Sequence, residues 1–502
     1  MRSRACTRRC RPWPHGEGSV SDAAFASRIT ELNDALPRAG AYVLYWMQNS
    51  QRTRCNHALE YAIGRANELR VPALVCFAVT PDYPDASERH YRFMIEGLAD
   101  VAAGLKRRGV AFVVRFGDPP AVALDVGRDA SLIVCDRGYL RHLRQWRFDV
   151  ARTARCPVVE VETDLAVPVE AASSKREYAA RTIRPRIHRR LAEHLVMPDQ
   201  IDPDHLLDPV PAGVDVGDVD AVIGRVSADV YPGPVSRFFR GGESAAWSRF
   251  ERFRDSALER YEEQRSEPAS GVASGLSPYL HFGQISDLEI AIELGAHEFV
   301  AGLEQGKGRM SNQPGSVGMR TDSATLASSR DAFLEELLVR RGLAFNYVWY
   351  TPNYDRYEAL PDWARGTLDD HRGDERPACY TQEQLEAART HDEYWNAAMT
   401  EMKVTGSMQN YMRMYWGKKI LEWSKSPEHG FETTLALNNR FFVDGRDPNS
   451  YANVGWIYGL HDRPWTERDV FGKVRYMNAK GLERKFDMAA YRLKVDELTR
   501  RE

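Results

Sequence analysis

The stretch PALVCFAV, residues 72–79, decides the fold class because it is apolar from end to end. Similar runs begin at Ala41 (AYVLYW), Val110 (VAFVVRFGD), Ser131 (SLIVCD) and Pro157 (PVVEV). Polar segments with helical periodicity separate these runs at a spacing of about thirty residues. Because strands of this kind are buried on both faces, the pattern predicts an α/β domain with a doubly wound parallel sheet.

A sheet of this kind binds ligands at the carboxyl ends of its strands. No G-x-G-x-x-G motif follows the first expected strand, so the sequence gives no support for a nucleotide-dependent dehydrogenase.

Beyond Gly242 the periodicity becomes helical nearly to the end, with amphipathic segments such as 243–265 and 331–348. We expect a disordered extension over residues 1–35, an α/β domain over 36–200, a connector over 201–242 and an all-α domain over 243–490. Residues 301–329 are rich in Gly and Ser and lack periodicity, which predicts a mobile insertion.

The bulk composition is that of a globular protein. The chain has 502 residues, 43% of them hydrophobic, a net charge of −3 and no long apolar window. We therefore expect a cytoplasmic monomer that does not enter membranes. If the source is bacterial, we expect it to associate with the nucleoid. The seven cysteines are scattered, which favours reduced thiols, and no metal site is indicated. The Arg-rich start of the chain is interpreted as part of the disordered extension. A transit peptide, a nucleic-acid arm and an upstream start codon are the alternatives that the sequence leaves open.

The segment NYMRMYWGKKILEW, residues 410–423, places Arg413, Trp416 and Trp423 on one helical face. Indoles stacked in this way can pass an electron along, and Trp395 in HDEYWNAA could extend the row. The alternative is that these tryptophans only fill a core.

Two further segments carry candidate binding groups. Ser274, Leu276 and Ser277 precede Pro278, which is typical of a helix start that can hold an anion, or of an ordinary serine cap. Between residues 463 and 485 aromatic and basic side chains alternate, which favours nucleic-acid binding over a solvated charged face.

Several longer strings, taken in order, carry a family resemblance. They are NHALEYAIGRANEL (56–69), SSKREYAARTIRPRIHRRL (173–191), SGLSPYLHFGQIS (274–286), FLEELLVRRGLAFNY (333–347), VDGRDPNSY (443–451) and HDRPWTERDVFGKVRYMN (461–478). Together they resemble the DNA photolyases and cryptochromes, and specifically the class II photolyases that repair cyclobutane pyrimidine dimers. The resemblance covers about residues 41–487.

The resemblance implies light-driven repair of UV-damaged DNA by reduced FAD, a deoxyribodipyrimidine photo-lyase activity, and an antenna chromophore of unknown identity when one is bound. The residues it implies for FAD binding are Tyr261, Ser274, Leu276, Ser277, Arg413, Asn438 and Asp444. Arg413 and Asp444 would form a salt bridge beside the flavin ring, and Asn438 would face its N5. Ala273 stands where the family often has a hydroxyl residue.

The resemblance also implies a catalytic set and a DNA-binding set. Trp395, Trp416 and Trp423 would form the tryptophan row, in an order that the sequence leaves open. Glu336 would hydrogen-bond the pyrimidine dimer, with Arg340 one turn later facing the same cavity, although the neighbouring Glu335 is the alternative carboxylate. Trp456 would pack on the dimer, and Arg463, Lys473 and Arg475 would contact DNA.

The main alternative is a cryptochrome, a light sensor that would keep the flavin and the tryptophans. Glu336, the basic aromatic run and the lack of a long tail after Asp487 favour repair. A (6-4) photolyase, a light-independent flavoprotein and a plain DNA-binding module are less consistent with these strings.

Overall fold

The computed structural model describes residues 20–226, 229, 231–304 and 322–500. Its α/β part contains the five predicted strands, in the order in which they were expected. They are β2 (Tyr42–Trp46), β3 (Ala73–Val79), β4 (Ala111–Phe116), β5 (Ala130–Asp136) and β6 (Val158–Val161). They pair in parallel within a sheet of order β1-β6-β5-β2-β3-β4, so the predicted fold class is confirmed.

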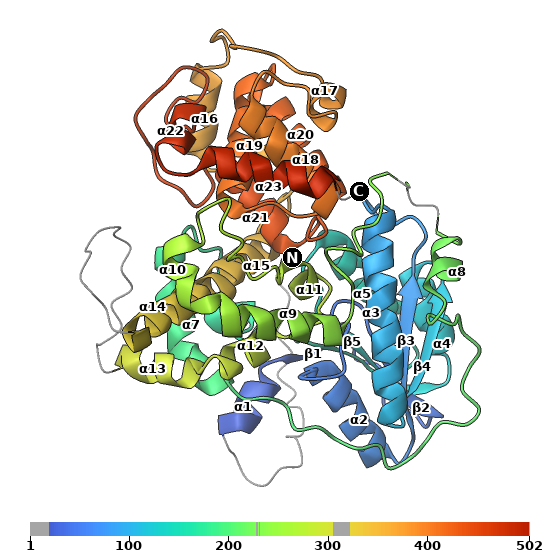
Figure 1. Cartoon of the computed structure of the whole chain (residues 1–502). Coiled ribbons are helices and arrows are strands. Elements are labelled where there is room, and N and C mark those ends of the chain that lie inside the picture. The colour runs from blue at the N-terminus through green and yellow to red at the C-terminus, as the bar shows by residue number, and fades with distance from the viewer. Residues whose placement is uncertain (1–19, 227–228, 230, 305–321, 501–502) are drawn as a thin grey trace.

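Helices cover both faces of the sheet, as its apolar strands require. Alternate residues of β2 serve opposite faces, because side chains along a strand point to opposite sides. Tyr45 packs toward α2 (His57–Leu69) and α3 (Glu88–Arg107), whereas Leu44 packs toward α4 (Pro119–Val126) and α5 (Arg141–Thr153). Figure 1 shows the long helix α3 lying along the sheet.

Part of the expected amino-terminal extension is ordered, which corrects the prediction for residues 20–31. They form α1 (Val20–Ala26) and β1 (Ile29–Glu31), and β1 pairs antiparallel with β6. Arg28 fixes this segment, because its guanidinium donates to the carbonyl oxygens of Leu165 at 2.9 Å and Ala166 at 2.6 Å. The Arg-rich residues 1–19 lie outside the described residues.

The described residues beyond Gly242 fold into helices joined by loops, as predicted. The helices that bear on the site are α9 (Glu243–Ser256), α10 (Tyr261–Gln264), α11 (Ser277–His281), α18 (Glu393–Thr405), α19 (Asn410–Trp423), α20 (Pro427–Phe441), α21 (Pro448–Ile457) and α23 (Met488–Arg500). In Figure 1 the orange and red helices α18 to α23 gather at one end of the molecule, away from the blue sheet.

Helices also replace both ends of the expected insertion. Residues 301–304 close α13 (Ala296–Glu304), and residues 322–329 open α14 (Asp322–Leu334). The prediction of an irregular loop over 301–329 is therefore corrected at its two ends, and 305–321 lie outside the described residues.

Two buried side chains of α3 join the α/β part to the helical part. Arg89 donates to the carbonyl oxygens of Phe441 and Lys403, each at 2.7 Å, and His90 Nε2 lies 2.9 Å from the carbonyl oxygen of Phe442. These contacts hold the loop after α20, which carries Asp444, against the α/β part.

None of the described helices is both long and apolar enough to cross a membrane. Cys55, Cys76, Cys135 and Cys156 are buried free thiols and Cys379 is an exposed one, while Cys6 and Cys10 lie outside the described residues. In the described part of the chain, no cluster of His, Cys, Asp and Glu could hold a metal ion.

Candidate active site and sheet-edge pocket

Helix α19 presents Arg413 and Trp416 to one partner, Phe442. The Cζ atom of Arg413 lies 3.6 Å from the centre of the Phe442 ring, and the Trp416 and Phe442 ring centres are 6.2 Å apart at 83°. The three-residue spacing puts both side chains on one face of the helix. The predicted common face is therefore present for this pair.

Arg413 and Asp444 form a partly buried ion pair. Arg413 Nη2 lies 3.0 Å from Asp444 Oδ1, and the two side chains are 15% and 16% exposed. Gly445 packs this loop onto α20, since a Cβ there would lie 2.9 Å from the carbonyl oxygen of Asn438. The buried Asn438 side chain donates to Asn439 Oδ1 at 3.3 Å. The fold thus brings together the three residues predicted beside a flavin ring.

The three predicted row tryptophans are buried and adjacent. Trp395 and Trp423 have ring centres 5.6 Å apart at 66°, and Trp395 Nε1 donates to the carbonyl oxygen of Trp416 at 2.9 Å. The close ring contact of Trp423 is therefore with Trp395 of α18. The prediction that Trp416 and Trp423 stack directly is corrected in this respect, because α18 packs against α19 and inserts Trp395 beside them.

Two residues that sequence reasoning missed continue this row outward. Tyr380 and His391 have ring centres 5.2 Å and 5.3 Å from that of Trp423. The Tyr380 hydroxyl lies 2.6 Å from His391 Nδ1. The chain therefore places a tyrosine and a histidine, in contact with each other, beside Trp423. No local sequence pattern signals this contact, because Tyr380 lies outside the helix that carries Trp423.

The predicted anion-holding turn has the expected form. Leu276 N–H donates to Ser274 Oγ at 3.4 Å, Gly275 has φ +65°, and α11 begins at Ser277 with Pro278 in its first turn. Leu276 is buried in a cluster that also contains Val443, next to Asp444. The turn and the loop that carries Asp444 therefore contribute to the same hydrophobic core.

Tyr261 and Glu336 meet through Arg265. Tyr261 packs edge-on against Phe253 and Phe333, at ring distances of 5.7 Å and 5.3 Å. Arg265 lies with its Cζ 5.7 Å from the Tyr261 ring and its Nη1 2.8 Å from Glu336 Oε1. Burial raises the pKa of Tyr261 to about 12, and the Glu336 carboxylate adds to this.

The two candidate carboxylates, Glu335 and Glu336, have different surroundings. Both lie in a π-helical segment, η2 (Glu335–Arg340), inserted before α15 (Arg341–Tyr350). Glu335 points into the protein and binds Arg184 Nη2 at 2.6 Å, whereas the Glu336 side chain is 40% exposed. Of the two, Glu336 is the one available to a ligand.

Arg340 does not pair with Glu336, which corrects the expectation of a shared i,i+4 face. Its Nε lies 3.8 Å from Glu335 Oε1. The reason is the π-helical turn, in which residues five apart lie above one another. Segments of this kind are common at functional sites.

The basic aromatic run forms a cluster around Arg475. Its Cζ lies 4.4 Å from the Trp465 ring centre and 5.5 Å from that of Trp456. Arg463 stacks on the same Trp465 ring at 5.0 Å, and Lys473 lies 3.9 Å from Glu467. Trp465 is 36% exposed, so the cluster reaches the surface.

Lys418, which sequence reasoning missed, lies beneath this cluster. It is fully buried on α19, donates to the carbonyl oxygen of Ile457 at the end of α21, and has its Nζ 5.3 Å from the Trp456 ring centre. Burial lowers the pKa of Lys418 to about 7, with Asp462 favouring and Arg475 opposing the charged form. The sequence did contain a signal for this residue, because Lys418 lies among mostly apolar residues of the segment 410–423.

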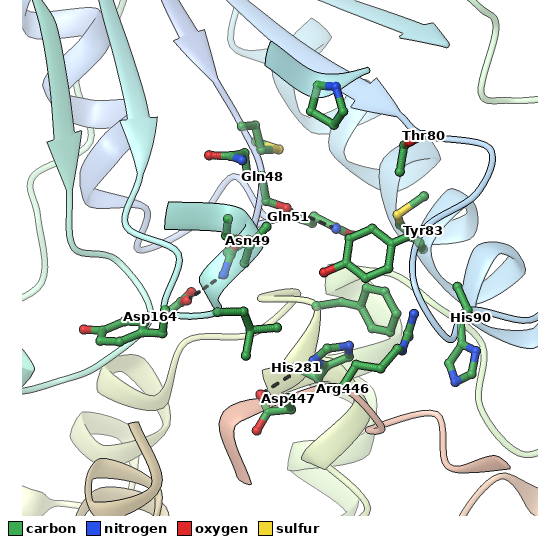
Figure 2. Close-up of a pocket in the computed structure, with 18 of the residues that line it drawn as sticks. Gln48, Asn49, Gln51, Thr80, Tyr83, His90, Asp164, His281, Arg446 and Asp447 are labelled. Atoms are coloured by element: carbon green, nitrogen blue, oxygen red, sulfur yellow. Dashed lines mark hydrogen bonds and ion pairs between the residues drawn. The ribbon is translucent and has the colours of Figure 1, made fainter. Parts of the chain in front are cut away.

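A cavity lies at the carboxyl ends of β2 and β3, where a doubly wound sheet binds ligands. Its walls include Trp46, Phe77, Tyr83, Tyr139, Leu143 and Trp146. Its floor comes from the end of α11 and the loop before α21, through His281, Phe282, Arg446 and Asp447. Figure 2 shows His281 and Asp447 side by side on this floor, 3.6 Å apart.

One end of this cavity is polar and incompletely hydrogen-bonded. Asn49 donates to Asp164 Oδ2 at 3.2 Å, and Gln51 Nε2 donates weakly to the Gln48 carbonyl oxygen at 3.4 Å. Three polar atoms here are buried with no hydrogen-bond partner among the described residues: Gln48 Nε2, Gln48 Oε1 and Gln51 Oε1. Burial raises the pKa of Asp164 to about 7, with nearby Glu162 adding to this.

Comparison with known proteins agrees with this architecture. Residues 43–211 match the family described as DNA photolyase. A deoxyribodipyrimidine photo-lyase of Methanothermobacter thermautotrophicus is 44% identical, over 93% of this chain and 97% of the relative, and one of Oryza sativa is 39% identical over 93% and 89%. A class III photolyase structure from Agrobacterium tumefaciens has a TM-score of 0.67 at 19% identity, covering 92% of this chain and 88% of the other.

The fold and the relatives define a two-part α/β and α-helical photolyase architecture. The chain belongs to the DNA photolyase family. The expected enzyme class is confirmed by relatives that carry the name deoxyribodipyrimidine photo-lyase at 36–44% identity.

Proposed function

We propose that this protein repairs cyclobutane pyrimidine dimers in DNA in a light-driven reaction, with reduced FAD as cofactor, in the manner of class II photolyases. The observation that carries the proposal is the arrangement of α19. One helix holds Arg413 at the Asp444 pair, Trp416 at the aromatic row, and Lys418 beneath Trp456. A single rigid element therefore links a cofactor side, an electron route and a substrate side.

The residues present suit a buried, negatively charged flavin. Ser274, Leu276 and Ser277 would hold the pyrophosphate through backbone N–H groups, which face outward at a helix start. Arg413 would supply positive charge near the ring, fixed in place by Asp444, and Asn438 would meet the ring with an amide that can donate or accept. The Trp416 Nε1 atom is buried without a partner in the described part of the chain, so this region has hydrogen-bonding capacity for a bound group. When bound, reduced FAD supplies the light-excited electron that opens the cyclobutane ring and then recovers it.

The substrate side would act on a nucleotide removed from the stack, as photolyases as a class do. Trp456 would pack on the dimer, and Trp465 with Arg463, Lys473 and Arg475 would hold the DNA backbone and fill the space left in the duplex. Glu336, held by Arg265, would hydrogen-bond the dimer. Because most of these contacts are to phosphate and base faces, sequence preference should be small.

Electrons would reach the cofactor through Trp416, Trp395 and Trp423. The hydrogen bond from Trp395 to the Trp416 backbone and the Trp395–Trp423 ring contact make this a continuous path. Tyr380 would give its hydroxyl proton to His391 when it passes an electron to Trp423, which leaves a neutral tyrosyl radical.

The sheet-edge cavity would hold the antenna chromophore. Its aromatic walls suit a planar ring system, and the Gln48 amide and Gln51 Oε1, which have no partner among the described residues, suit the polar edge of such a ring. A structural neighbour from Sulfolobus tokodaii, at 17% identity, is described with two FAD molecules, which imply a novel light-harvesting cofactor in that protein. The monomeric state and the cytoplasmic location also stay predictions.

The decisive experiment uses purified protein loaded with reduced FAD and an oligonucleotide that holds one thymine dimer. Restored thymines are counted with and without blue light. Repair that requires light would support the proposal. FAD binding and photoreduction without any repair would overturn it in favour of a cryptochrome-like sensor.

A further inference from the structure

Arg446 is a buried cation, and two of its three side-chain nitrogen atoms have no acceptor among the described residues. It is 5% exposed, and its Nε and Nη2 atoms are buried with no hydrogen-bond partner among the described residues. Burial lowers the pKa of this guanidinium. Because an unpaired buried charge is costly, charges of this kind are normally matched by an opposite charge.

The guanidinium is aimed into open space. Arg446 lines the sheet-edge cavity and also a second, adjoining cavity that shares Tyr83 with it. Figure 2 shows its side chain rising from the cavity floor toward Tyr83, and its Cζ lies 5.5 Å from the Tyr83 ring centre. An anion placed between the two cavities would meet this side chain directly.

The nearby titratable groups do not neutralise it. Burial lowers the pKa of His90 and lowers that of His142 to about 4, and Arg446 is the next largest cause in both. On the floor, Asp447 faces His281, and Asp85 accepts from Asn439 Nδ2 at 3.2 Å. Asp85 favours the charged form of Arg446 from a distance, but neither Nε nor Nη2 of Arg446 has a hydrogen-bond partner within the described residues.

The backbone holds Arg446 in this position from the flavin side. Its φ is +67°, and its N–H donates to Asn439 Oδ1 at 3.0 Å, the same oxygen that accepts from Asn438. A non-glycine residue in this conformation persists only where its surroundings enforce it. The cation is therefore built into the loop that also carries Asp444.

We propose that Arg446 binds an anionic group of the molecule that occupies the sheet-edge cavity. The cavity then selects an anionic aromatic chromophore over a neutral one of the same shape, with the polar edge of the ring at Gln48 and Gln51. This inference rests on the proposed antenna role of the cavity. Two chemistries share the required anion, a phosphate on the side chain of the chromophore and an ionised hydroxyl on its ring.

The test measures chromophore binding to protein whose flavin site is already filled with FAD. One arm compares FMN with riboflavin, which lacks the phosphate. The other compares a deazaflavin with an ionised ring hydroxyl against its neutral methyl ether. We expect one anionic probe to bind at least about tenfold more tightly than its neutral partner, as a charge-assisted hydrogen bond provides.

Arg446→Gln should reduce this preference to less than about twofold, because it leaves a neutral amide in place of the cation. Arg144→Gln is the matched control, since Arg144 lies on neighbouring α5, stacks on Trp349 at 4.4 Å and does not line the cavity. Thermal unfolding without chromophore separates function from structure. The Arg446→Gln protein should melt at the same temperature as the wild type or above it, because an unpaired buried charge is removed.

Each outcome bears on the inference. Equal binding of anionic and neutral probes would overturn the anion preference and leave the antenna role intact. Failure of all four probes to bind would overturn both. A marked fall in melting temperature for Arg446→Gln would show that Arg446 supports the fold instead. Light-driven repair by reduced FAD, measured without chromophore, tests the proposed function separately.

Discussion

The protein uses tryptophan in two contrasting settings. Trp395, Trp416 and Trp423 are between 0% and 2% exposed and lie among methionine, leucine and phenylalanine side chains. Trp456 and Trp465 lie in a cluster that reaches the surface, with Arg475 between them. The same side chain thus serves a dry interior row and a surface cluster with cations.

The contrast corresponds to the two proposed functions, electron transfer and DNA binding, which depend on different properties of the indole. An interior row needs fixed, closely spaced rings, which close packing provides. A surface cluster needs exposed ring faces and mobile positive charge to meet bases and phosphates. Variants that damage one setting should therefore leave measurements of the other nearly unchanged.

Trp416→Phe should break the interior row most severely. Phenylalanine keeps the packing against Phe442 but is far harder to oxidise, so photoreduction of bound FAD should slow on the order of 100-fold, equivalent to about 2.7 kcal/mol in activation free energy. Absorbance of the flavin during blue illumination measures this rate. DNA affinity should change by less than about twofold, since Trp416 is buried away from the surface.

Trp349→Phe is the control for that experiment, because Trp349 stacks on Arg144 outside the row. Photoreduction in Trp416→Phe at the rate of this control would show that the electrons take another route.

Arg475→Gln should damage the surface cluster. It removes a cation that contacts both Trp456 and Trp465, so affinity for dimer-containing DNA should fall about tenfold and the salt dependence should weaken by about one phosphate contact. Fluorescence anisotropy across a salt series measures both quantities. Photoreduction should keep the wild-type rate.

The matched control is Arg372→Gln, an exposed arginine whose Nη2 binds Glu428 at 2.5 Å. If both variants bind DNA equally well, Arg475 does not belong to the DNA surface.

Lys418 lies between the two settings, and its titration should appear in stability. Its pKa is about 7 in the folded protein and near 10.5 when unfolded. Between these values the unfolded chain binds more protons, so stability rises with pH, by about 1 kcal/mol from pH 7 to pH 8. Lys418→Met keeps the length of the side chain and removes this contribution.

The measurement compares melting temperatures of wild type and Lys418→Met at pH 7 and pH 8. The wild type should gain stability relative to the variant at the higher pH. Parallel behaviour of the two proteins would mean that Lys418 stays charged when folded.

Much of the fold followed from local patterns. The continuous apolar runs, such as residues 72–79, predicted all five parallel strands because burial on both faces leaves a direct trace in composition. The boundaries of α19 agree with the quoted segment 410–423. The sequence did not predict edge strand β1, because a strand of three residues is too short to show periodicity. Arg28, just before it, looked like a surface residue, and its buried position depends on carbonyl partners that the sequence does not reveal.

The candidate site was less predictable because its contacts join distant segments. An α-helical spacing placed Arg340 with Glu336, whereas the π-helical turn pairs it with Glu335. The neighbours of Trp423 come from α18 and from the segment before it, which no local pattern could indicate. Likewise, an arginine in VDGRDPNSY gives no sign that two of its guanidinium nitrogens lack an acceptor, which depends on every element around it.

The smallest expected effect concerns the outer end of the interior row. Trp423 Nε1 is buried with no hydrogen-bond partner among the described residues, so an oxidised Trp423 has no direct acceptor for its proton. In the proposed route Tyr380 would give up an electron as its hydroxyl proton passes to His391, whose Nδ1 lies 2.6 Å away. Tyr380→Phe removes this step, so the photoreduced flavin should lose its electron back to the row about threefold faster, equivalent to about 0.7 kcal/mol.

Transient absorption after a laser flash measures that lifetime. Tyr394→Phe is the control, because its hydroxyl binds Glu483 at the surface at 3.0 Å. Equal lifetimes in the two variants would place the end of the electron route at Trp423. A shorter lifetime in Tyr380→Phe alone would show that the electron route includes the tyrosine. It would also support the proposed contrast between a dry interior that moves electrons and a wet surface that holds DNA.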